Sequence, residues 1–152
     1  MNYKEDNKYL EIVDDILSND EFKSLKNYKH HGINRYDHCI NVSYASYKHA
    51  IKHKYKTYKE VTRAALLHDF FLINNQEISI IKRISVLFTH PRTALEISRK
   101  YFKLTKLEEN IILTHMFPLG IRIPKYKESW LVCWIDDVLS IKERFLSIFK
   151  KN

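Results

Sequence analysis

The chain has 152 residues, of which 45% are hydrophobic, and it contains only two glycines and three prolines. This composition is too apolar for a disordered chain and too poor in turn residues for a protein of many short strands, so it favours an all-α fold. The formal charge of +8 at pH 7 would attract polyanions such as nucleic acid, anionic lipid or a phosphorylated small molecule, without choosing among them.

The length suits one domain, residues 1–152, whose core needs neither disulfides nor a structural metal. Cys39 and Cys133 lie far apart in stretches with helical spacing, so they predict neither a disulfide framework nor a metal knuckle. The N-terminal segment is charged, and no apolar run is long enough to span a bilayer. We therefore expect a cytoplasmic protein with no membrane partner, and the oligomeric state stays open.

Helical spacing of apolar residues predicts helices over residues 5–17 and 21–29. Between them, residues 18–20 (SND) break the pattern and offer an N-cap, and Gly32 ends it. A longer helix is predicted from residue 35 to about residue 53. On this helix the following residues share one face: His38, Val42, Ala45 and His49.

The next predicted helix carries a histidine and an aspartate inside the apolar run RAALLHDFF, residues 63–71. Thr57 is its expected cap, with Glu60 in the capping-box position. The spacing places His68 on the apolar side, with Asp69 about 100° further around the helix. We therefore expect His68 to point into the core.

Residues 78–88 are predicted to form a short helix, although their β-branched content also suits a strand. Pro91 suits the first turn of the helix that follows. This arrangement would place His90 at the mouth of that helix, beside its unpaired backbone N–H groups.

Thr105 and Glu108 have capping-box spacing, and the helix that they open is expected to turn His115 inward. An irregular loop follows, and the last helix is predicted from about residue 128 to residue 149. Asp137 is rotated away from the buried side of this helix. That side is formed by Val132, Ile135, Asp136, Leu139 and Leu146.

Five separate segments thus each offer a ligand-type side chain on or next to an inward face: His38, His68 with Asp69, His90, His115 and Asp136. Imidazoles and carboxylates suit borderline divalent ions such as Fe, Mn, Ni or Zn, whose charge would offset the cost of burying the carboxylates. Any single buried histidine is more often a hydrogen-bonded core residue than a ligand. The coincidence of five segments predicts a shared metal centre.

These motifs, in this order, resemble the HD-domain superfamily of metal-dependent phosphohydrolases, named for its His–Asp doublet: RYDHC, ALLHDF, THPRTA, IILTHM and LVCWIDDVLS. The resemblance covers roughly residues 32–140 and implies an all-helical domain. It implies that one metal is held by the first histidine, the doublet and the late aspartate, which match His38, His68, Asp69 and Asp136. His90 and His115 correspond to the further ligands of binuclear members, in which Asp69 would bridge two ions.

The resemblance implies hydrolysis of a nucleotide or another small phosphate ester by a metal-activated water. We expect Asp69 and His68 at the reacting centre, with Arg35, one turn before His38, stabilising the developing charge. The RY-x-H opening and the HPRTA segment look most like the bacterial branch that hydrolyses diadenosine tetraphosphate symmetrically. Leu72 stands where the superfamily often has a lysine, which leaves the substrate open. The basic side chains that could bind its phosphates are Arg35, Arg92, Arg122 and Lys125.

Two other functions stay open. Some relatives of this fold use a mixed-valent di-iron centre to oxidise substrates, so a di-iron oxygenase is one alternative. The other is a non-catalytic module that binds a nucleotide or nucleic acid, although the Tyr- and Lys-rich residues 44–61 suit a packed and solvated helix better than a base-stacking surface. His30 and His31 could lie near the metals or simply end a helix, and their role stays open.

Overall fold

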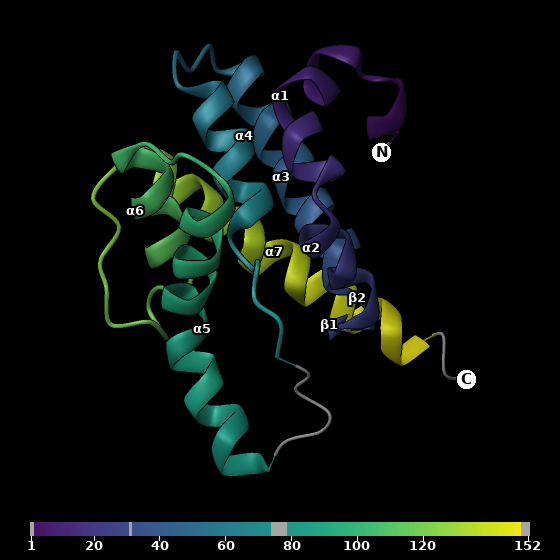
Figure 1. The fold of residues 1–152 in the computed structure, drawn as a ribbon, viewed down its shortest axis with the longest axis vertical. Helices are drawn as coiled ribbons and strands as arrows, with labels where there is room; N and C mark the ends of the chain where they lie inside the picture. Colours follow the sequence, from purple (N-terminus) through teal and green to yellow (C-terminus); the bar gives the residue numbers. More distant parts are fainter. Residues whose placement is uncertain (1, 31, 74–78, 150–152) are drawn as a thin grey trace.

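The computed structural model describes residues 2–30, 32–73 and 79–149, and it confirms the all-α prediction (Figure 1). The helices are α1 (Asn7–Ser18), α2 (Asp20–Lys23), α3 (Arg35–Lys52), α4 (Tyr58–Leu67), α5 (Ile80–Tyr101), α6 (Lys106–Thr114) and α7 (Lys127–Phe149). Two 3-10 turns, η1 (Tyr3–Glu5) and η2 (Ser24–Asn27), and an antiparallel ribbon of β1 (Lys29–His30) and β2 (Ile33–Asn34) complete the described elements. None of the helices in the described ranges combines the length and hydropathy needed to cross a bilayer.

Helix α4 lies at the centre of the bundle, where it contacts α1, α3, α5, α6 and α7 (Figure 1). Ala64 and Ala65 are fully buried, and their small side chains let the surrounding helices approach closely. Leu66 and Leu67 are also fully buried, and the helix ends there. The histidine and aspartate that follow Leu67 are therefore delivered directly into the middle of the bundle.

Buried polar contacts fix α1 against α3 and α4. The Tyr9 hydroxyl donates to Ser43 Oγ at 3.1 Å, and the Ser43 hydroxyl donates to the Thr62 carbonyl at 2.7 Å. On the outside, Arg63 of α4 donates to Asp15 of α1 at 2.9 Å. The hydroxyls of Tyr9 and Ser43 therefore both have partners, so neither carries the desolvation penalty of an unsatisfied polar group.

The helix predicted over residues 21–29 is wrong in its second half. Its α-helical part ends at Lys23, and the chain then passes through η2 into the β1–β2 ribbon. Gly32, at the turn of this ribbon, has φ 93°, a conformation that favours glycine. A Cβ at Gly32 would also collide with Ser147 of α7, so the ribbon can pack here only with glycine.

The prediction that Pro91 opens a helix is also wrong, because Pro91 lies inside α5. Proline removes one i to i−4 hydrogen bond and normally breaks or kinks a helix. Here Val86, on the N-terminal side of Pro91, and Ala94 and Leu95, on its C-terminal side, are all buried. This apolar burial on both sides outweighs the lost bond, and His90 consequently lies within the helix.

Two smaller predictions about helix ends are wrong. Thr57 makes no side-chain cap, because its φ of −90° and ψ of 19° are not the extended conformation of a cap. Its hydroxyl donates instead to Glu128 Oε1 of α7 at 2.9 Å. Leu146 is 51% exposed rather than buried, because the last turns of α7 project past the bundle (Figure 1).

The capping box of α6 is confirmed: the Thr105 side chain accepts from the Glu108 N–H, and Glu108 accepts from the Thr105 N–H. Thr105→Ala removes one half of this pair and should lower the free energy of unfolding by about 1 kcal/mol. Thr105→Ser keeps the hydroxyl and is the matched control. Denaturant unfolding of the three proteins measures the effect, and equal stabilities would show that the cap contributes nothing.

A candidate metal centre

Every side chain predicted to bind metal is buried in one region of the bundle. His38 comes from α3, Asp136 from α7 and His90 from α5. His68 is the C-cap residue of α4 and is followed by Asp69, and His115 is the C-cap residue of α6. Their exposed fractions range from 0% for His38 and His68 to 6% for His90 and Asp136. The predictions that His68 and His115 point inward are confirmed.

His38, His68 and Asp136 form a first group of potential ligand atoms. The Nε2 atoms of His38 and His68 lie 3.0 Å and 3.6 Å from the same Asp136 oxygen, Oδ1. Three donor atoms from three helical segments, α3, the end of α4, and α7, thus converge on one point. They come from positions up to 98 residues apart in the sequence.

His68, Asp69 and His115 form a second group, which shares His68 with the first. Asp69 Oδ1 lies 3.3 Å from His90 Nε2 and 3.5 Å from His115 Nε2, whereas Asp69 Oδ2 lies 4.0 Å from His68 Nε2. The two Nε2 atoms of His90 and His115 are 3.0 Å apart. Asp69 therefore turns Oδ1 toward His90 and His115 and Oδ2 toward His68, the residue that the two groups share.

The Nδ1 atoms of three of these histidines are held by backbone carbonyls. His68 Nδ1 donates to the Ala65 carbonyl at 2.7 Å, and His115 Nδ1 donates to the Ile112 carbonyl at 2.7 Å. Carbonyls in the last turn of a helix lack intrahelical partners, so each C-cap histidine satisfies one of them. His90 Nδ1 donates to Val86 within α5 at 3.0 Å. Each bond fixes the ring and reserves Nε2 for the shared site.

Glu143 holds Nδ1 of the fourth histidine, His38, and was not identified from the sequence. Its Oε2 accepts from His38 Nδ1 at 2.8 Å, and its Oε1 accepts from the Asn41 side chain at 3.0 Å. Glu143 is seven residues after Asp136, so two turns of α7 bring both carboxylates to the same face. That spacing was the available signal, but nothing in the sequence connects Glu143 to His38.

The buried carboxylates and histidines of the site stabilise each other's charged forms. Although burial lowers the pKa of His38, its hydrogen bonds to Asp136 and Glu143 raise that pKa to about 10. Burial also tends to raise the pKa of Asp69 and Asp136, but the nearby histidines, first His68, hold both pKa values well below the usual range. Both aspartates are therefore ionised at neutral pH, and cationic partners are needed to compensate them.

The residues present fit a bound transition metal. His68 Nε2 is buried and has no hydrogen-bond partner among the described residues, although it faces two carboxylates. A buried imidazole nitrogen that lacks a hydrogen-bond partner and lies beside ionised carboxylates is typical of a metal ligand. Imidazole and carboxylate donors together suit Fe, Mn, Ni or Zn.

The phosphate contact expected of Arg35 does not fit its position, because its side chain is fully buried. Its guanidinium donates to the carbonyls of Phe71 and Ile73, at 2.5 Å and 3.2 Å, and stacks on the Phe71 ring at 3.6 Å. The Phe71 ring in turn contacts the ring of His90, with centroids 4.9 Å apart. Arg35 thus holds the segment that follows the doublet against the site.

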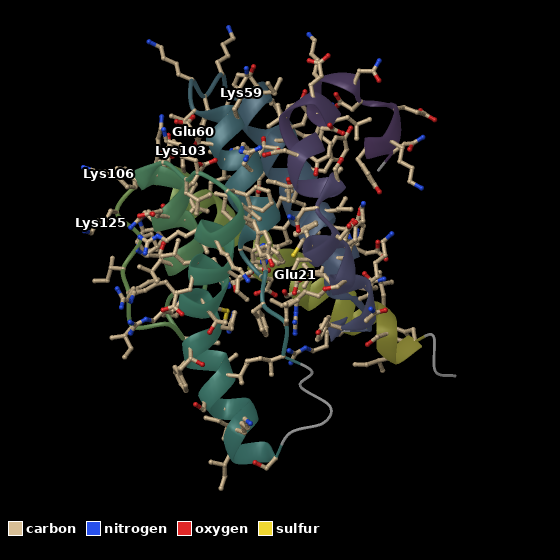
Figure 2. All side chains as sticks on the ribbon, in the orientation of Figure 1. Glu21, Lys59, Glu60, Lys103, Lys106 and Lys125 are labelled. Atoms are coloured by element: carbon tan, nitrogen blue, oxygen red, sulfur yellow. The ribbon has the colours of Figure 1, made fainter. Side chains whose placement is uncertain are left out.

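The other predicted phosphate-binding cations are not brought together with the six buried residues. Arg92 is exposed and pairs with Glu96 at 3.1 Å, and Arg122 is exposed on the loop between α6 and α7. Lys125 lies at the outer edge of the molecule on the same side as Lys106 (Figure 2). The residues named from the sequence at the end of the second predicted helix, His30 and His31, lie outside the residues whose side chains the structure describes.

Comparison with known families agrees with this geometry. The chain matches the family model of the HD domain over residues 35–140, a segment that contains all six buried residues. The chain therefore belongs to the HD domain family, and the resemblance predicted from the sequence is confirmed at that level. No curated protein and no solved structure shows a significant match.

The Glu143 contact gives the stability of the chelator-treated protein a defined pH dependence. The pKa of His38 is about 10 in the fold, above the usual 6.5, so its stabilising charge is fully present below about pH 6.5 and is lost as the pH rises through about 10. Glu143→Gln removes one charge partner and should lower the free energy of unfolding by about 2 kcal/mol near pH 6. Denaturant titrations in chelator should find this difference shrinking toward pH 10. A difference that does not change with pH would contradict the pairing.

Proposed function

We propose that the protein is a metal-dependent phosphohydrolase that acts on a nucleotide or another small phosphate ester. The observation that carries this proposal is the convergence of four histidine Nε2 atoms on two buried, ionised carboxylates, with every Nδ1 held by an oxygen acceptor. A hydrophobic core gains nothing from such an arrangement, because each buried charge costs several kcal/mol unless it is compensated. Membership of the HD domain family supports the same conclusion.

The two groups of donor atoms suggest which residues would hold metal. Following the family resemblance, His38, His68, Asp69 and Asp136 would hold one ion. His90 and His115, whose Nε2 atoms lie 3.3 Å and 3.5 Å from Asp69 Oδ1, would hold a second, so Asp69 would serve both ions. A bound divalent metal supplies a water activated for attack on phosphorus and neutralises charge on the phosphoryl oxygens.

Hydrogen bonds within the chain fix the protonation and orientation of the ligand histidines. The carbonyls of Ala65, Val86 and Ile112 and the carboxylate of Glu143 keep the Nδ1 proton on each ring, which leaves Nε2 as the ligating atom. Ligation through His38 Nε2 requires the loss of its second proton, so metal affinity should increase with pH. The stacked Arg35 and Phe71 side chains hold the chain after the doublet and exclude water from behind His90.

The substrate class follows from charge and from sequence motifs. The formal charge of +8 favours an anionic substrate. The motif from Arg35 to His38 and the segment around His90 support a place in the bacterial branch that hydrolyses diadenosine tetraphosphate. A di-iron oxygenase would differ in being inactive with redox-inert metals such as Zn.

Asp69→Ala tests the assignment of the doublet. It removes the carboxylate that would serve both ions, so we expect loss of bound metal and at least about a 100-fold loss of phosphate release. Asp37→Asn is the control, since Asp37 precedes His38 in the sequence but is exposed. Elemental analysis and a phosphate-release screen over nucleotides measure both properties, and full turnover by the Asp69→Ala protein would refute the proposal.

Glu143→Gln tests the support of His38. The glutamine keeps the size of the side chain but accepts a weaker hydrogen bond from Nδ1, so metal affinity should decrease by roughly 10- to 100-fold. Glu96→Gln, at an exposed position on α5, should leave metal affinity unchanged. Competition with a chromogenic chelator gives both dissociation constants, and equal values would mean that Glu143 serves only packing.

A further inference from the structure

Arg35 is a buried cation, and no carboxylate among the described residues forms an ion pair with it. Its guanidinium is held by the carbonyls of Phe71 and Ile73, and it lies 3.6 Å from the centre of the Phe71 ring and 5.5 Å from that of Tyr28. Burying a charge is costly, and an apolar side chain of similar size would fill the same space at lower cost. The guanidinium is therefore better explained by what it holds than by packing alone.

The guanidinium holds an irregular segment directly after the doublet. Helix α4 ends at Leu67, and residues 70–73 form neither helix nor strand. Their carbonyls consequently lack the partners that a helix would give them, and the N–H groups of Arg35 supply partners for two of them. Because Arg35 lies on α3 one turn before His38, this pair of hydrogen bonds ties the segment after Asp69 to the helix that carries another predicted ligand.

The ring of Phe71 connects this segment to His90. Phe71 is 2% exposed, and its ring centroid lies 4.9 Å from that of His90. Outside α5, His90 also contacts Asp69 and His115, which are themselves predicted ligands. The first turns of α5 project past the bundle, with Ile81 82% exposed, so they contribute little to holding His90 (Figure 1). The Phe71 ring is therefore a contact that fixes His90 without relying on bound metal.

The ligands assigned to the first ion are fixed by other contacts. Glu143 holds Nδ1 of His38, and the Ala65 carbonyl holds Nδ1 of His68. Neither contact involves the segment after the doublet. A change in the position of that segment should therefore affect the two ions unequally.

We propose that Arg35 is a positioning residue: acting through Phe71, it fixes the ring of His90 and so sets the affinity for the second metal ion, with little effect on the first. This inference rests on the proposed function, because it takes the buried histidines and carboxylates to hold two ions. Displacement of His90 would remove one of the two histidines assigned to the second ion, whereas the side chains assigned to the first ion would stay in place.

Charge and position make opposite predictions for Arg35. A fixed cation close to bound metal weakens binding by repulsion. An electrostatic role alone therefore predicts tighter binding of both ions when Arg35 is replaced by an uncharged residue. A positioning role predicts weaker binding of the second ion.

Calorimetric titration of Mn²⁺ into protein stripped of metal measures both affinities. Phe71→Leu removes the ring without changing charge, so it should raise the second dissociation constant by at least about 10-fold while the first stays within about 3-fold. Arg35→Met and Arg35→Lys should do the same, because neither replacement can hold both carbonyls and stack on the ring. The double variant of Arg35→Met with Phe71→Leu should bind the second ion no more weakly than either single variant, since both residues act through one contact.

Phe70→Leu is the matched control. Phe70 is also buried, but it packs on Phe22, with ring centroids 5.4 Å apart. Its replacement removes a buried ring from the same segment, so it should lower thermal stability as Phe71→Leu does but leave both Mn²⁺ affinities within about 3-fold. Circular dichroism confirms that each variant is folded, and Phe71→Leu alone carries the test if the Arg35 variants do not fold.

The outcomes separate this inference from the proposed function. Two ions bound with equal second affinities by the natural, Phe71→Leu and Phe70→Leu proteins would overturn the inference and leave the proposed function intact. Tighter binding of both ions by Arg35→Met would also overturn it, because only the charge of Arg35 would then matter. A natural protein that binds a single Mn²⁺ ion would refute the second site and the inference with it. A natural protein that binds none of Mn²⁺, Ni²⁺ or Zn²⁺ would overturn the proposed function itself.

Discussion

The structure depends on the burial of two ionised carboxylates at the centre of a small helical bundle. Asp69 and Asp136 are almost completely buried, and histidine rings from α3, α4, α5 and α6 surround them. Buried charges of one sign are tolerated only where opposite charge compensates them. The helices that meet at α4 therefore have to converge on the carboxylates, and the apolar core closes around that point.

The ends of α4 and α6 orient the rings of His68 and His115. His68 and His115 both follow the last residue of a helix, and both donate Nδ1–H to the carbonyl three residues earlier. The same bond satisfies an otherwise unpaired carbonyl and turns Nε2 toward the carboxylates. In α7, Asp136 and Glu143 both lie on the buried face of the helix, two turns apart, and both contact His38.

Periodicity and capping signals predicted the parts of the site that lie on one helix at a time. The inward orientation of His68 and His115 and the capping box at Thr105 followed from spacing alone. Pro91 misled the prediction because local proline preference was overridden by burial on both sides of it. The partnership of Glu143 with His38 spans 105 residues, and the buried role of Arg35 depends on carbonyls that only the folded chain places nearby. Such contacts are properties of packing, which a sequence pattern does not encode.

The central claim is that the buried histidines and carboxylates hold metal, and metal content measures this most directly. Protein purified without chelator should contain about two transition-metal ions per chain by elemental analysis, as expected for two adjoining donor groups. Absence of bound metal, even after Mn, Fe, Ni and Zn are each supplied to folded protein, would contradict the account and would leave the cluster as a hydrogen-bonded core.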